Sequence, residues 1–176
     1  LRLTPVNFDR PIHLIQMCRG IGHSVCLTKD NVLFVWGNGP KGQLGLGNVK
    51  QVEKPTVIQC LRNHSIKKIA AGNDFTLFLL KNGLVMITGS ELSSCLGKET
   101  PGDFFVPTII NSLLSLDTCD LDCGPNHVVV ITAKGRALAW GHNDFGQLGI
   151  GNSSKKIILE PMSILMTDQV IFKKVF

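Results

Sequence analysis

One glycine-rich segment has the spacing of a nucleotide-binding loop. Gly37, Gly39 and Gly42 satisfy the pattern Gly-x-Gly-x-x-Gly after an apolar run, and in that motif a pyrophosphate lies on the N-terminus of the helix that follows. Here the chain continues with Gln43-Leu44-Gly45-Leu46-Gly47, which does not start a helix. Gln43 also stands where a phosphate-binding loop has its lysine. The segment therefore predicts no nucleotide site.

Two cysteines and a histidine have a spacing that suggests zinc. Cys119, Cys123 and His127 stand four residues apart. On a helix this spacing would bring the side chains to one face, but the segment has the pattern of strands and a turn. A structural zinc site also needs further ligands, and the sequence has no second Cys/His pair at a suitable spacing. We therefore expect buried thiols and a structural histidine here, and no metal site.

Acidic residues cluster at one place only. Asp117, Asp120 and Asp122 lie close together in the sequence, and we expect a solvated loop there rather than a cation site. No Ser-His-Asp or Cys-His order is recognisable, and no two carboxylates have a reason to be close, as nucleophilic or acid–base catalysis would need. The sequence therefore predicts no catalytic residue and no cofactor.

A repeat of 52 residues organises the chain. Several glycines and one leucine recur at this step, and the third copy then slips by two residues near Ser153. A fixed period of about 40–50 residues is typical of four-stranded β-propeller blades. The recurring sets are Gly20, Gly72 and Gly124; Gly37, Gly89 and Gly141; Leu44, Leu96 and Leu148; and Gly45, Gly97 and Gly149.

Each copy contains two short apolar runs separated by a tight turn. An Asn or Gly in each turn can supply the positive φ that hairpins require. Further strands are expected near Thr56–Gln59 and Ile66–Ala70, and no segment has a sustained helical period. The sequence therefore predicts an all-β fold of antiparallel four-stranded propeller blades. The paired runs are Ser24–Thr28 with Val32–Trp36, Thr76–Leu80 with Leu84–Thr88, and Val128–Thr132 with Arg136–Trp140.

The recurring glycines and aromatic residues are interpreted as structural. Glycine permits a tight turn or a close approach where the chain leaves a strand. Trp36 and Trp140 are expected to pack between adjacent blades, and His23 and His127 to be hydrogen-bonded structural histidines; Phe75 holds the same position in the second copy. The predicted structural motif residues are Gly20, His23, Trp36, Gly37, Gly42, Gly45, Gly72, Gly89, Gly97, Gly124, His127, Trp140, Gly141, Gly146 and Gly149.

The combination of these motifs resembles the regulator of chromosome condensation repeat. Its elements are Gly-x-x-His, a strand that ends in Trp-Gly, and Gly-Gln-Leu-Gly-x-Gly-Asn, and the copies at 20–48 and 124–152 match them. The second copy is degenerate, with Thr88 for Trp, Ser94-Cys95 for Gly-Gln and Glu99 for Gly. The resemblance implies a propeller of seven blades, of which this chain holds about three.

We expect a single repeat array over residues 1–176. Residues 1–17 are predicted to end a preceding blade, 18–69 to form the first repeat, 70–121 the degenerate second repeat, and 122–175 the third. Because propellers need about four to eight blades to close, the chain is expected to be a segment of a longer propeller, either a fragment or a natural truncation. Flanking propeller blades in the full-length chain are then expected to contact it.

The composition excludes disorder and a membrane span. Hydrophobic residues make up 44% of the chain and charged residues 18%, and no apolar run approaches the roughly 18 residues of a membrane helix. The net charge of +5 is spread out and Tyr is absent, unlike the basic stripe with aromatics of a nucleic-acid-binding surface. The charge permits an acidic partner, and nucleosome or chromatin contact is a minor alternative.

The six cysteines include no Cys-x-x-Cys pair. The chain is long enough to build an apolar core without disulfides, so reduced thiols and a cytoplasmic or nuclear location are expected.

Two classes of function remain. The first is a protein-interaction or regulatory scaffold, because relatives of the family occur appended to kinases, ubiquitin ligases and lipid-binding modules. The alternative is guanine nucleotide exchange on a small Ras-like GTPase, the activity for which the family is known. Asp74 lies where the resemblance implies a functional acidic residue in exchange-active members. Asn73, His142 and Asp144 are predicted with it as partner-binding loop residues.

Overall fold

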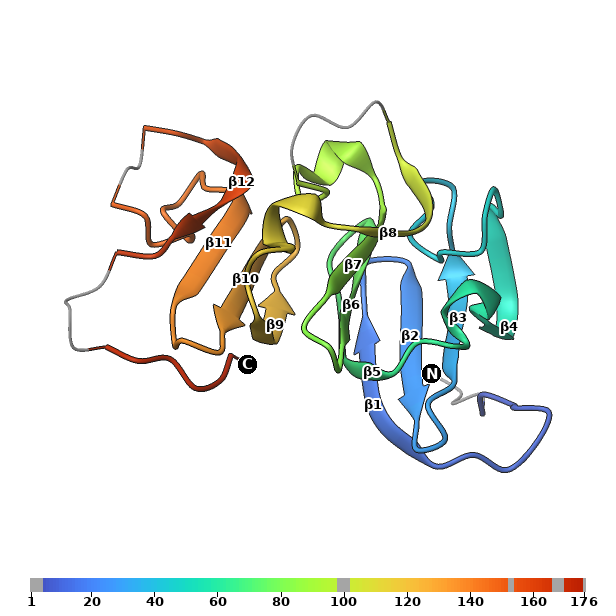
Figure 1. Ribbon diagram of the computed structural model, residues 1–176. Helices are drawn as coiled ribbons and strands as arrows, with labels where there is room; N and C mark the ends of the chain where they lie inside the picture. Colours follow the sequence, from blue (N-terminus) through green and yellow to red (C-terminus); the bar gives the residue numbers. More distant parts are fainter. Residues whose placement is uncertain (1–4, 98–101, 152–153, 166–169, 176) are drawn as a thin grey trace.

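The chain folds into three four-stranded antiparallel sheets, which confirms the all-β prediction (Figure 1). The computed structural model describes residues 5–97, 102–151, 154–165 and 170–175. Within each sheet, strands that are consecutive in sequence are neighbours in space. The strands are β1 (Leu14–Arg19), β2 (His23–Thr28), β3 (Leu33–Asn38) and β4 (Gln51–Val57); β5 (Ile66–Ala71), β6 (Phe75–Leu80), β7 (Val85–Gly89) and β8 (Phe104–Ile109); and β9 (Thr118–Cys123), β10 (His127–Thr132), β11 (Ala137–His142) and β12 (Ile157–Ser163).

The sheets repeat at the same step as the sequence. Their first strands begin at Leu14, Ile66 and Thr118, 52 residues apart. Each sheet is called a blade below. The blades thus begin four residues before the predicted sequence repeats, which start at residues 18, 70 and 122. The motif residue Asn152, the slip near Ser153 and Glu99 lie outside the described residues. In the described part of the chain, helix is limited to three 3-10 turns, η1 (Gln59–Leu61), η2 (Glu91–Ser93) and η3 (Asn111–Leu113).

The outer strand of the first blade differs from its prediction. We expected a strand near Thr56–Gln59, whereas β4 covers Gln51–Val57 and Gln59 begins η1. Most β4 side chains are exposed, because the strand is the edge of its sheet. A search for apolar runs misses such a strand, since solvent contact lets most of its residues be polar.

The middle blade is buried on both of its faces. All six side chains of β6 are buried, and alternate residues point to opposite faces of the sheet. Phe78 and Leu80 belong to the apolar cluster shared with the first blade, and Leu77 and Leu79 to the cluster shared with the third. The core therefore lies between blades, so each blade is covered only by its neighbours.

The predicted positive-φ residues of the hairpin turns are present. Asn31, Gly83 and Gly135 have φ values of 62°, 84° and 76°. A further position shows how the second repeat departs from the pattern: Gly42 has a φ of 87°, and Ser94, 52 residues later, keeps the left-handed backbone with a φ of 57°. The loop geometry is thus retained where the glycine is lost, at the cost of backbone strain, because Ser94 has a Cβ.

The innermost strands are joined by side chains at one equivalent position, Gln16, Lys68 and Asp120. Gln16 Nε2 donates to the Ile69 carbonyl oxygen at 2.8 Å, and the Ile69 N–H donates to Gln16 Oε1 at 3.0 Å. Lys68 Nζ donates to Asp120 Oδ1 at 2.8 Å, and the Val175 N–H donates to Asp120 Oδ2 at 2.9 Å. The same position thus links neighbouring inner strands by side-chain hydrogen bonds in each case.

The solvated loop expected at Asp117, Asp120 and Asp122 is therefore wrong for the last two, which lie in β9. Asp120 is 8% exposed. Its burial raises the pKa, but the hydrogen bonds from Lys68 and from the Val175 N–H outweigh burial, and the pKa lies below its usual value. The acidic residues were misinterpreted because their cationic partner is 52 residues away in the sequence.

Replacing Asp120 by Ala is expected to lower the free energy of unfolding by about 2 kcal/mol, because it leaves the half-buried Lys68 ammonium without its counter-charge, with only the hydrogen bond to the Val175 carbonyl oxygen. The exposed Asp117→Ala in the same acidic cluster is the control and should change it by less than about 0.5 kcal/mol. Urea unfolding at pH 7 measures both. Equal effects of the two substitutions would contradict the assignment.

Candidate functional site

The connections of the blades gather on two opposite faces. His23 at the start of β2 pairs with Gly37 near the end of β3, so the turn before β2 and the loop after β3 lie at the same end of the sheet. The same holds in the other blades. We call this end, made of the first–second and third–fourth strand connections, the loop face. The opposite hairpin face carries the β-hairpin turns and the connections between blades.

The four predicted partner-binding residues all lie on the loop face. Asn73 and Asp74 form the turn between β5 and β6, and His142 and Asp144 lie at the end of β11 and just after it. His142 Nδ1 is 3.3 Å from Asp144 Oδ2. No hydrogen bond between described residues joins the two pairs directly, so the structure places them on one face without bringing them together.

Asp74 is oriented by a residue that sequence reasoning had treated only as part of a motif. The buried Gln43 donates from Nε2 to Asp74 Oδ1 at a long 3.4 Å, and its Oε1 accepts from the Lys41 N–H at 3.0 Å. The Gly-Gln-Leu-Gly loop of the first blade therefore reaches the acidic turn of the second. The spacing of the motif residues gave no indication of the contact between Gln43 and Asp74, because Asp74 lies in the next repeat.

The loop also packs on the second blade through two buried hydroxyls. Thr76 Oγ1 donates to the Gln43 carbonyl oxygen at 2.7 Å, and Thr88 Oγ1 lies 2.7 Å from the Gly42 carbonyl oxygen. The Gly47 N–H donates to the Phe105 carbonyl oxygen at 2.9 Å. The motif glycines and glutamine thus join blade to blade, as a structural role requires.

His23 is a buried structural histidine, as predicted. It is 3% exposed, and its Nε2 lies 2.8 Å from Thr76 Oγ1. Because the Thr76 proton goes to Gln43, His23 must donate from Nε2, which leaves Nδ1 unprotonated and, within the described residues, without a partner. Burial lowers the pKa of His23 to about 4, although the Asp74 charge opposes this. His23 is therefore neutral at pH 7 and suited to packing rather than proton transfer.

The second interface replaces this polar pair by an apolar one. Phe75 occupies the histidine position and Val128 the threonine position, and both are fully buried in the same apolar cluster. The motif glycine is required in both cases, because a Cβ on Gly20 would collide with the His23 ring and one on Gly72 with the Phe75 ring. The apparent degeneracy of the second repeat is thus a coordinated change of two contacting residues.

The tryptophan prediction holds fully at one of its two positions. Trp140 is completely buried, and its Nε1 donates to the Cys95 carbonyl oxygen of the preceding blade at 2.8 Å. Trp36 is half-buried and contacts the Phe8 ring edge-on, with ring centroids 6.3 Å apart. Trp36 is therefore contacted by a residue that precedes the first blade, whereas Trp140 contacts another blade.

Two large apolar side chains project from the loop face. Ile21, between β1 and β2, is 75% exposed, and Leu92, in η2, is 70% exposed. Phe145, in the β11–β12 connection of the same face, is 95% exposed. Its counterpart in the first blade, Lys41, belongs to the loop that packs on the next blade, so we leave Phe145 out of the proposed partner-binding surface.

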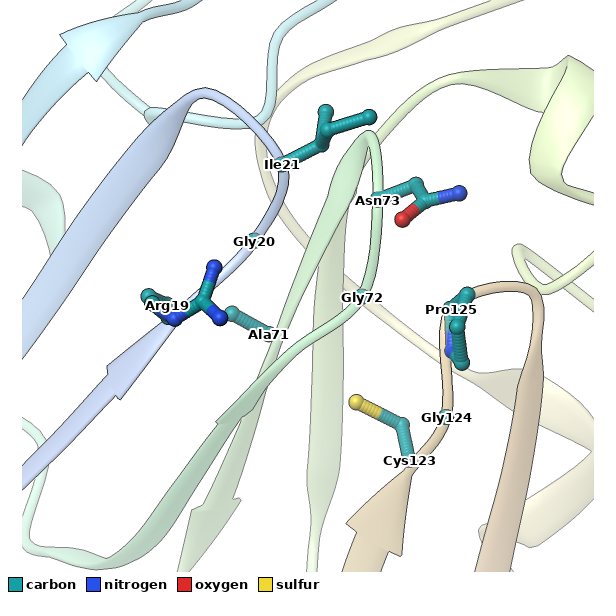
Figure 2. A pocket seen from close by; sticks show the side chains of 9 residues that line it. All are labelled: Arg19, Gly20, Ile21, Ala71, Gly72, Asn73, Cys123, Gly124 and Pro125. Atoms are coloured by element: carbon teal, nitrogen blue, oxygen red, sulfur yellow. The ribbon is translucent and has the colours of Figure 1, made fainter.

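A pocket of about 370 Å³ opens on the loop face where the inner strands of the three blades meet. In Figure 2 the side chains of Arg19 and Cys123 reach toward the space in front of Ala71 and Gly72. We call it the axial pocket. It is lined by Arg19, Gly20, Ile21, Ala71, Gly72, Asn73, Cys123, Gly124 and Pro125.

The remaining expectations concern the thiols, a metal site and a membrane span. All six cysteines carry free thiols. No group of three or more His, Cys, Asp or Glu side chains is arranged to hold a metal ion within the described ranges. In the part of the chain that the structure describes, no helix has the length and apolar character needed to cross a membrane.

Two family models for the regulator of chromosome condensation (RCC1) repeat match most of the sequence. One covers residues 30–79 and 134–176, and the other covers residues 66–95 and 119–147. The chain belongs to the RCC1 repeat family. The three four-stranded sheets are therefore blades of an RCC1-type β-propeller, as the motifs of the first and third copies predicted.

Curated relatives contain the RCC1 repeats within longer chains. The sequence is 29% identical over 166 residues to the ultraviolet-B receptor UVR8 of Arabidopsis thaliana, covering 94% of this chain and 37% of UVR8. It is 30% identical to the probable E3 ubiquitin-protein ligase HERC4 of Homo sapiens, covering 89% and 15% respectively. It is 32% identical to the serine/threonine-protein kinase Nek9 of Mus musculus, covering 77% and 14%.

Solved structures of RCC1 proteins share the fold. Prp20p of Saccharomyces cerevisiae, described with its binding properties to Gsp1p and histones, superposes with a TM-score of 0.78 at 24% identity. Human WBSCR16 superposes with a TM-score of 0.80 at 22% identity. The matches cover 89% and 92% of this chain but only 39% and 42% of those chains. The chain thus spans about two-fifths of the solved propellers it matches.

The low pKa of His23 predicts a pH-dependent stability. Since the unfolded histidine has a pKa near 6.5 and the folded one a pKa of about 4, the unfolded state binds more protons between these values. Stability is then full above pH 6.5 and falls by about 3 kcal/mol as the pH drops to 4. Urea unfolding across this range measures the loss.

The matched control is the double variant His23→Phe/Thr76→Val, which copies the Phe75 and Val128 pair of the next interface. It should fold and lose less stability than the wild type between pH 6.5 and 4. The half-buried His127, whose pKa burial also lowers, is present in both proteins and does not affect the difference. An unchanged pH dependence in the double variant would contradict the role of His23.

Proposed function

We propose that the chain is a protein-interaction scaffold, a propeller segment whose loop face binds a protein partner. The observation that carries the proposal is the exposure of Ile21 and Leu92 on that face, next to the polar turn at Asn73 and Asp74. Apolar side chains surrounded by polar groups are typical of protein interfaces. Loops held by a rigid scaffold are also where binding function concentrates.

The relatives support an interaction role over a shared catalytic one. By their names they are a light receptor, a ubiquitin ligase and a kinase, and one repeat type common to such different activities fits a binding module. The chain covers at most 37% of these three relatives, so their activities are not transferred to it. A cytoplasmic or nuclear location is part of the proposal, because free thiols persist in reducing compartments.

Replacing Leu92 by Ser is expected to weaken partner binding by about fivefold or more, since truncating an interface anchor costs more than about 1 kcal/mol. Leu114→Ser is the matched control, because Leu114 is also an exposed leucine of the second blade, 54% exposed beside η3 on the hairpin face. Quantitative affinity capture with the wild-type chain and both variants as baits measures the effect.

Proteins captured by the wild type should be lost with Leu92→Ser and retained with Leu114→Ser. Circular dichroism and urea unfolding establish that both variants fold. Equal capture by the three baits would overturn the assignment of the loop face, and loss with Leu114→Ser alone would move the binding site to the hairpin face.

Guanine nucleotide exchange on a small Ras-like GTPase is the second candidate. It is favoured by the position of Asp74, a half-buried carboxylate on the loop face whose side chain is oriented by Gln43. Prp20p, a propeller of similar fold, has binding properties to Gsp1p. An acidic side chain held at a rigid face has the chemistry to compete for a GTPase's Mg²⁺ and phosphate-binding groups.

Release of fluorescent GDP from a panel of small GTPases tests this candidate, with the longest propeller containing this segment as the catalyst. If exchange is the function, Asp74→Asn should slow release by about tenfold, the effect of one lost hydrogen bond to a charged group. The exposed hairpin-face variant Asp117→Asn should leave the rate unchanged. No acceleration on any GTPase would remove this candidate and leave the scaffold.

A further inference from the structure

The axial pocket exists because three blades place a glycine at the same point. Gly20, Gly72 and Gly124 line it, and each must lack a side chain because an aromatic ring three residues later occupies the space of a Cβ. The rings of His23, Phe75 and His127 thus support a pocket floor that is mostly backbone. The side chains that differ between the blades then decide what the pocket binds.

The residue before each of these glycines differs in the three blades. It is Arg19 in the first, Ala71 in the second and Cys123 in the third, and all three line the pocket (Figure 2). Arg19 is the only charged side chain among the lining residues. The small Ala71 side chain leaves open the space into which a guanidinium of the neighbouring blade can project.

The Arg19 guanidinium is free to bind a ligand. Among the described residues it makes no hydrogen bond and no ion pair, in contrast to Arg10, which pairs with Asp30. The Cys123 thiol faces the same pocket, and its pKa is raised by burial and by the Asp122 charge. Cys123 is therefore a neutral thiol at pH 7, so it adds a weak donor and no negative charge.

One neighbouring carboxylate limits the charge that the pocket accepts. Asp122 lies close enough to raise the pKa of Cys123 and of Cys18, and its Oδ1 accepts the Cys123 N–H at 2.8 Å. A lining with a single cation, and with this carboxylate next to Cys123, favours a monoanion over a phosphate dianion. The planar guanidinium donates two parallel hydrogen bonds, which a carboxylate accepts with both oxygens.

We propose that the axial pocket binds a carboxylate, the Asp or Glu side chain of the protein that docks on the loop face, with Arg19 as its main ligand. Asn73 is a second polar residue of the pocket lining. The proposal rests on the proposed function, because Ile21 belongs both to the pocket wall and to the exposed apolar surface that would contact the partner.

A blocked glutamate, N-acetyl-glutamate amide, is the probe for the pocket. Titrated into the ¹⁵N-labelled chain, it should shift the amide signals of Gly20, Gly72 and Gly124 in a saturable way, with a dissociation constant on the order of millimolar for one exposed ion pair. N-acetyl-glutamine amide, the neutral isostere, should not. Inorganic phosphate at pH 7.5 should bind more weakly than the glutamate.

The variant Arg19→Gln should weaken glutamate binding by about tenfold or more, the effect of losing a charge-assisted hydrogen-bonded pair. Arg62→Gln, which removes an exposed arginine of the hairpin face, should have no effect. Equal shifts with glutamine, tighter binding of phosphate, or persistence of binding in Arg19→Gln would each overturn the carboxylate site.

The source of the carboxylate is tested separately with the partner identified by capture. Arg19→Gln should weaken the binding of that partner. Substitution of one partner carboxylate should cause no further loss of affinity in the Arg19→Gln background. If the glutamate probe binds but Arg19→Gln leaves partner capture unchanged, the assignment to a partner side chain is overturned. Leu92→Ser leaves the pocket intact, so failure of the loop-face proposal is distinguishable from failure of the pocket.

Discussion

A four-stranded sheet with two apolar faces is stable only when both faces are covered, and the rest of this structure follows from that constraint. The five apolar residues of β6 divide between two clusters, one shared with each neighbouring blade. No blade therefore has a core of its own. Recurring motif residues such as Gln43 and Trp140 act across the boundary to another blade.

The blade boundary accepts more than one chemistry when both sides change together. His23 with Thr76 at one boundary and Phe75 with Val128 at the next fill equivalent space, one with a hydrogen bond and the other with apolar packing. Similarly, Gln16 bonds backbone atoms of the next inner strand, whereas Asp120 bonds Lys68 and the Val175 N–H. Repeats thus diverge in pairs of contacting residues, which keeps the step between blades constant.

The same divergence gives each blade different side chains on the loop face. Repetition places equivalent positions around one axis, and the residues at those positions differ: Arg19, Ala71 and Cys123 in the axial pocket, and Ile21, Asn73 and Pro125 at the tips of the inner turns. A shared backbone therefore presents one cation, one amide and isolated apolar groups around the axial pocket. These groups are the ones on which the proposed recognition of a protein partner rests.

The sequence by itself determined the fold class, the period and the hairpins, because glycines at fixed steps and short apolar runs report local backbone geometry. It misplaced the edge strand β4, whose solvated side chains carry no apolar pattern, and it misinterpreted Asp120, whose partner Lys68 lies one repeat away. Asp74 was found by motif, but its contact with Gln43 was not. Only the tertiary structure decided the pairings and the axial pocket, since these depend on residues brought together by the packing of separate blades.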